Sequence, residues 1–124
     1  MRDKLDWLWD DEPRQVWNED VEYVAEQVRS MEDKGPLSDM ILVQARWVAR
    51  IAKVMDTKNA KSRGKSWNGY EEGLTEIQET IWHVQDLLDL YQKLIPETER
   101  GQDWACAQKA LEYIEVLYEL LKLR

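Results

Sequence analysis

The segment SDMILVQARWVARIAKVM, residues 38–55, constrains the fold more than any other part of the chain. Apolar residues recur along it at helical spacing in one stripe, which comprises Ile41, Ala45, Val48, Ala52 and Met55. A second apolar set widens this stripe well beyond a narrow seam and comprises Val43, Trp47, Ile51 and Val54. A helix that is apolar on more than one side is usually buried in the centre of a fold. We therefore expect other helices to surround this segment.

Three further segments repeat apolar residues at steps of three and four, and local signals set their limits. Pro13 suits the first turn of one helix, and Gly35 followed by proline ends it. Ser38 is the expected N-cap of the next helix, Pro96 ends the third, and Gly101 precedes the fourth. The predicted helices span residues 13–34, 38–56, 70–95 and 103–123. No segment alternates as a strand would, so the sequence predicts an all-α fold, an up-and-down four-helix bundle.

The length of 124 residues fits a single helical domain covering residues 1–124, large enough to bury a core without disulfides. Leu5, Leu8 and Trp9 lie at helical spacing and predict a short extra helix at the amino terminus. The lone Cys106 cannot form an internal disulfide, and the first residues lack the layout of a secretion signal. No apolar run approaches the roughly 20 residues that cross a bilayer. These features predict a cytoplasmic protein without a membrane-spanning segment.

Charge is distributed very unevenly along the chain. The net charge of −8 divides into −6 for residues 1–35, +5 for residues 36–69 and −7 for residues 70–124. An acidic protein repels phosphate as a whole, so indiscriminate binding to nucleic acid is not expected. The positive middle third is therefore the candidate for local contact with an anionic partner.

Seven cations and one tryptophan make up this candidate nucleic-acid-binding set, which lies within residues 46–65 and at the end of a predicted basic loop, residues 57–69. They are Arg46, Arg50, Lys53, Lys58, Lys61, Arg63, Lys65 and Trp67. Several cations along one surface suit a phosphate backbone, and an aromatic ring can stack on an unpaired base. The alternative is that these cations neutralise the acidic helices of the same molecule. Both interpretations remain open on the sequence alone.

Seven tryptophans and no phenylalanine give the chain a second candidate set. Large rings on apolar faces are expected in the core, as for Trp47 and Trp104. Trp82 instead falls one position outside its apolar stripe, and Trp7 and Trp9 belong to a short terminal segment. Because exposed tryptophans often anchor protein interfaces, these three are candidate partner-binding residues. The alternative is that the terminal pair folds over the end of the bundle.

Four acidic residues and one histidine on the predicted third helix are of the types that hold a divalent metal ion; they are Glu72, Glu76, Glu79, Asp86 and His83. The single histidine lies four residues after Glu79, whereas di-iron bundles need two copies of Glu-x-x-His. A solvated polar face explains the pattern better. The sequence therefore predicts no cofactor, no metal and no catalytic residues.

Two classes of function follow from these observations. The first is a non-enzymatic helical subunit of a nucleoprotein complex, which contacts phosphate through residues 46–65 and protein neighbours through tryptophans. The second is an acidic adaptor or inhibitor that acts through residues 13–34 and 70–121, such as a nucleic-acid mimic of the phage or anti-defence type. A metal-dependent all-α hydrolase is a remote third. A protein partner is expected in the first two, and the sequence leaves the oligomeric state open.

Overall fold

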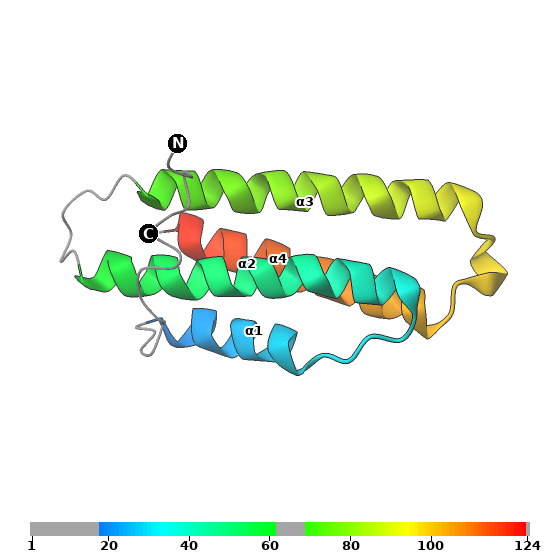
Figure 1. Ribbon diagram of the computed structural model, residues 1–124, viewed down its shortest axis with the longest axis horizontal. Helices are drawn as coiled ribbons and strands as arrows, with labels where there is room; N and C mark the ends of the chain where they lie inside the picture. Colours follow the sequence, from blue (N-terminus) through cyan, green and yellow to red (C-terminus); the bar gives the residue numbers. More distant parts are fainter. Residues whose placement is uncertain (1–17, 62–68, 124) are drawn as a thin grey trace.

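The computed structural model describes residues 18–61 and 69–123, with side chains described for all of these except residues 59–61. Four α-helices and one short 3-10 helix follow one another: α1 (Glu19–Ser30), α2 (Pro36–Lys61), α3 (Gly69–Leu94), η2 (Glu97–Glu99) and α4 (Gln102–Lys122). Successive α-helices run in opposite directions, and the described residues contain no strand (Figure 1). The prediction of an all-α, up-and-down four-helix bundle is confirmed.

The α2 and α4 helices form the centre of the bundle and make its most extensive helix contact. Small buried residues line both helices at helical spacing and allow their backbones to approach closely: Ala45, Ala49 and Ala52 on α2, Ala107 and Ala110 on α4. The α1 and α3 helices lie on opposite sides of α2, with α4 behind it (Figure 1). This arrangement leaves one face of α2, the face directed away from α4, between α1 and α3.

The first helix is shorter than the predicted span of residues 13–34. Asn18 has an extended backbone, and its side-chain oxygen accepts hydrogen bonds from the N–H groups of Asp20 and Val21 at 2.9 and 3.3 Å, so it is the N-cap of α1. The helix ends at Ser30, and residues 31–34 are not helical. Glu32 and Asp33 are exposed, and acidic groups disfavour a helix C-terminus, which explains why the helix does not continue. Residues 13–17 and the predicted amino-terminal helix lie outside the described residues.

The second helix is longer than predicted at both ends. It begins at Pro36, which suits the first helical position, and so Ser38 lies within the first turn and is not the N-cap. It continues to Lys61 because residues 51–57 are all buried, and this packing holds the helix beyond the predicted end at residue 56. Lys58 and Lys61, which were predicted in the basic loop, belong to α2, and residues 62–68 of that loop lie outside the described residues.

A carboxylate from α4 caps the N-terminus of α2. The Oδ2 and Oδ1 atoms of Asp103 accept hydrogen bonds from the backbone N–H groups of Leu37 and Ser38 at 3.1 and 2.7 Å. Gly35 makes this approach possible, because a Cβ atom there would lie 2.6 Å from Cγ of Asp103. Burial raises the pKa of the Asp103 carboxyl, but hydrogen bonds from Ser38 and Leu37 outweigh it and hold that pKa below its ordinary 3.8. The cap fixes the start of α2 against the start of α4.

Candidate functional site

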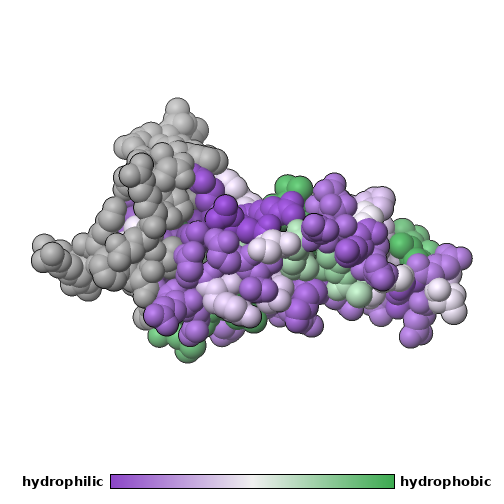
Figure 2. All heavy atoms as spheres, turned by 90° about the horizontal axis from the view of Figure 1, so that it is seen from below, coloured by the Kyte–Doolittle hydropathy of each residue, from purple (hydrophilic) through white to green (hydrophobic). Residues whose placement is uncertain are grey.

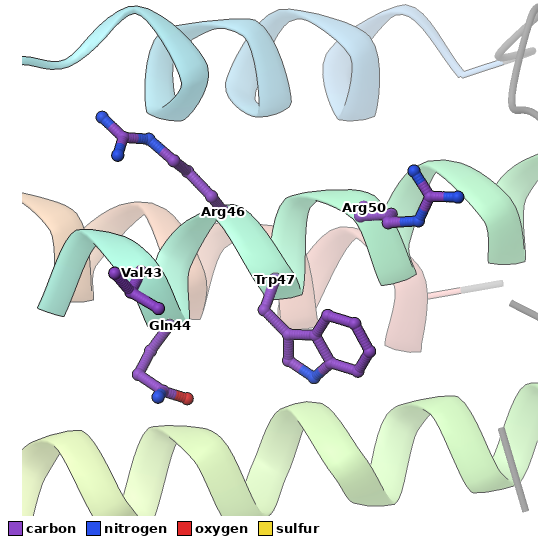
Figure 3. A pocket seen from close by; sticks show the side chains of 5 residues that line it. All are labelled: Val43, Gln44, Arg46, Trp47 and Arg50. Carbon is purple, nitrogen blue, oxygen red and sulfur yellow. The ribbon is translucent and has the colours of Figure 1, made fainter. Parts of the chain in front are cut away.

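The open face of α2 forms a groove that the sequence did not predict. Five side chains from two turns of this one helix line a hollow of about 500 Å³: Val43, Gln44, Arg46, Trp47 and Arg50. Figure 3 shows them on α2, with α1 along one side of the hollow, α3 along the other and α4 behind. Val43 is 56% exposed, although it belongs to the most apolar segment of the chain. We refer to this hollow as the α2 groove.

The two sides of the α2 groove differ in chemistry. Arg46 reaches toward α1, where its Nη2 donates a hydrogen bond to the carbonyl oxygen of Met31 at 2.8 Å. A guanidinium group has five N–H donors, so this bond leaves donors that can bind a ligand. Trp47 and Gln44 point toward α3 on the opposite side (Figure 3). The groove therefore combines a cationic side next to α1 with an aromatic side next to α3.

Lys53, one turn beyond Arg50, is used inside the molecule. It is only 8% exposed, and its Nζ lies 3.6 Å from a carboxylate oxygen of Glu22 and 3.5 Å from one of Glu26, both on α1. The predicted positive surface running from Arg46 through Lys53 is therefore interrupted. A lysine buried in this way needs a partner, and the α1 carboxylates provide it.

The other predicted residues are distributed as follows. Lys58 is half-buried near the end of α2, and the side chains of Lys61, Arg63, Lys65 and Trp67 lie outside the described residues, as do Trp7 and Trp9. Trp82 is 58% exposed on α3, beside a smaller hollow of about 210 Å³ that Leu74 and Tyr118 also line. The expected surface position of Trp82 agrees with the structure, and its role in partner binding stays a prediction.

Sequence reasoning placed Val43 and Trp47 with the core, whereas the structure leaves Val43 exposed and Trp47 half-buried. A signal was nevertheless present. Val43, Arg46, Trp47 and Arg50 follow the spacing i, i+3, i+4 and i+7, so they form one face of their own. Two arginines inside such a stripe indicate a face that is not fully buried.

The candidate metal-binding carboxylates of α3 do not converge. Within residues 18–61 and 69–123, no three side chains of His, Cys, Asp or Glu lie together in a way that could hold a metal ion. In the same part of the chain, none of the helices combines the length and the apolar character needed to cross a membrane.

No protein-family model, no curated protein and no solved structure matches the chain.

Proposed function

We propose that this protein is a non-enzymatic binding protein that attaches to a protein partner through the α2 groove. The supporting observation is that the central helix of the bundle exposes an apolar side chain and a half-buried tryptophan next to two arginines. Tryptophan and arginine are the residue types that contribute most to protein interfaces, whereas lysine is depleted there. A valine exposed on a central helix adds little to the stability of the free protein, and a binding role explains its presence.

A charge placed on the floor of the groove tests this proposal. Val43→Asp should leave the fold intact, because the side chain is exposed, while placing a carboxylate where an apolar group of the partner would lie. Val116→Asp on α4 is a matched control, since Val116 is also an exposed valine, at 43%. Affinity purification from the native host with quantitative mass spectrometry should show a protein that is lost with Val43→Asp and retained with Val116→Asp. Equal recovery of every protein with both variants would contradict the proposal.

Phosphate binding by a nucleoprotein subunit is the second candidate. It is favoured by the surplus of seven basic over two acidic residues within residues 36–69. Lys53 contributes nothing to such a surface because Glu22 and Glu26 hold it, so the cations of this candidate are Arg46, Arg50, Lys58, Lys61, Arg63 and Lys65. The wild type should bind a labelled single-stranded oligonucleotide with an affinity that falls as salt is added, as measured by fluorescence anisotropy. Reversing the charges of Lys61, Arg63 and Lys65 should abolish this binding. If a copurifying protein stays bound after nuclease treatment and is lost with Val43→Asp, the result would instead favour a protein partner.

The acidic outer faces of the bundle offer the alternative surface for an adaptor or inhibitor. Exposed carboxylates on α3 and α4 include Glu72, Glu79, Asp86, Glu112 and Glu115. The side of the molecule that carries α1 is also largely hydrophilic, with separate hydrophobic patches (Figure 2). A partner with a basic groove would bind these faces and would be insensitive to Val43→Asp. The same purification therefore distinguishes the two surfaces.

A further inference from the structure

We infer that the α2 groove takes an amphipathic helix of the partner, with acidic side chains along the edge facing α1 and apolar side chains toward α3. This inference rests on the proposed function and specifies the chemistry of the partner. Its starting point is that the groove presents two rows of different character on a single helix, an apolar row and a cationic row.

The spacing of both rows matches one turn of a helix. Val43 and Trp47 are four residues apart, as are Arg46 and Arg50, and four residues rise about 6 Å along an α-helix. Residues at i and i+4 of a partner helix repeat at the same distance, so one helix can match both rows at once. A helix placed there would lie over α2 between α1 and α3 and pack as a further member of the bundle. The described residues contain no strand whose edge could instead receive an extended peptide.

Charge indicates that the partner helix is acidic only in part. Arg46 projects from the floor toward α1, and its remaining N–H donors suit a carboxylate, which accepts hydrogen bonds from a guanidinium group in a two-pronged geometry. Further along the same side, Glu22 and Glu26 surround Lys53 and are 43% and 45% exposed. An anionic partner that continued in that direction would meet these carboxylates.

This pattern favours a peptide over a phosphate backbone. A nucleic acid carries a charge at every nucleotide and cannot omit one beside Glu22 and Glu26. A helix can place carboxylates opposite Arg46 and Arg50 alone and carry neutral side chains elsewhere. The apolar floor at Val43 and the ring of Trp47 would then be covered by aliphatic or aromatic side chains of that helix.

A displayed library of helical peptides, randomised along one face, tests the inference with the full-length protein. Peptides selected on the wild type should bind the Val116→Asp protein and fail to bind Val43→Asp. Their sequences should combine apolar residues with two acidic residues three or four positions apart. Arg46→Glu should weaken the selected peptides about tenfold or more, and changing their acidic residues to lysine should restore binding to that variant. Lys93→Glu, on exposed α3 surface, is the matched control and should have little effect.

Three results would overturn the inference in distinguishable ways. Groove-dependent peptides that are basic or neutral would refute the acidic helix and leave the proposed function standing. Enrichment of no peptide that depends on Val43 would contradict the proposed function itself. Concentration-dependent dimerisation of the protein alone, abolished by Val43→Asp in sedimentation experiments, would replace the outside partner with a second copy of this chain.

Discussion

The two halves of α2 belong to one continuous helix and face different surroundings. Between Met40 and Arg50 one side of the helix is open, with Val43 exposed and Trp47 half-buried. From residue 51 to residue 57 every side chain is buried, including three polar ones, Lys53, Asp56 and Thr57. The closed half, residues 51–57, is therefore buried on every side, whereas the open half, residues 40–50, keeps one side exposed.

The difference shows how one helix separates folding from binding. In the closed half, buried polar side chains bind other parts of the molecule: Lys53 pairs with α1 carboxylates, and Oδ2 of Asp56 accepts a hydrogen bond from the N–H of Asn18 at 2.9 Å. In the open half, Arg46 lies at the surface and retains donors after its bond to Met31. Substitutions in the closed half should therefore affect stability, and those in the open half should affect binding.

The largest expected effect is the loss of a core side chain from the closed half. Ile51→Ala removes a fully buried side chain and leaves a cavity, which should lower the free energy of unfolding by about 2–5 kcal/mol. Urea denaturation followed by circular dichroism measures this change. A loss below about 1 kcal/mol would mean that the closed half is not packed as described.

Charge reversal should destabilise the fold more at Lys53, in the closed half, than at Arg46, in the open half. Lys53→Glu puts a third carboxylate beside Glu22 and Glu26 in a buried position and should destabilise the fold by about 2–4 kcal/mol. Arg46→Glu, at the surface, should cost less than about 1 kcal/mol. Lys53→Met is the control for packing and should cost less than Lys53→Glu, because it adds no carboxylate and water can solvate Glu22 and Glu26, which are 43% and 45% exposed. Equal losses for the two reversals in urea denaturation would remove the distinction between the halves.

The sequence predicted the fold well because the fold depends on local patterns. The apolar spacing, Pro96 and Gly101 placed α3 and α4 within one residue of their observed limits at each end. The predicted limits of α1 and α2 were less accurate. The apolar spacing predicts a helix from residue 13, whereas α1 begins after its N-cap, Asn18. Tertiary packing extends α2 past the predicted end at residue 56.

The candidate site was harder to predict because exposure depends on the neighbouring helices. Lys53 and Arg50 have the same charge and are three residues apart, yet only the position of α1 determines that Lys53 is buried against carboxylates. The Asp103 cap joins residues 65 positions apart along the chain, and local sequence rules for caps consider only adjacent residues. Periodicity identifies a face, and the packing of the other helices determines whether that face is covered.

Removing the charge of Asp103 tests the cap at the start of α2, just before the open half, and should have a smaller effect on stability. Asp103→Asn should cost about 1 kcal/mol near neutral pH, the usual contribution of a helix cap. The pKa of Asp103 is lower in the folded protein than its ordinary 3.8, so the ionised group stabilises the fold above 3.8, and this stabilisation is lost as the pH falls through the lowered value. The difference between wild type and variant in urea denaturation should therefore shrink in acid. A difference that is independent of pH would indicate that the charge of the carboxylate is not what stabilises the cap.

The smallest expected effect on stability belongs to the groove floor, and it is the most informative about the comparison. Val43→Asp should change the free energy of unfolding by no more than about 0.5 kcal/mol, because Val43 is exposed and Arg46 lies nearby to offset the added charge. Val116→Asp, measured by the same urea denaturation, should behave alike. A much larger loss for Val43→Asp alone would show that this side chain contributes to folding in the free protein, and the open half of α2 would then be part of the core. Similar small changes would leave binding as the explanation for an exposed valine on the central helix of the bundle.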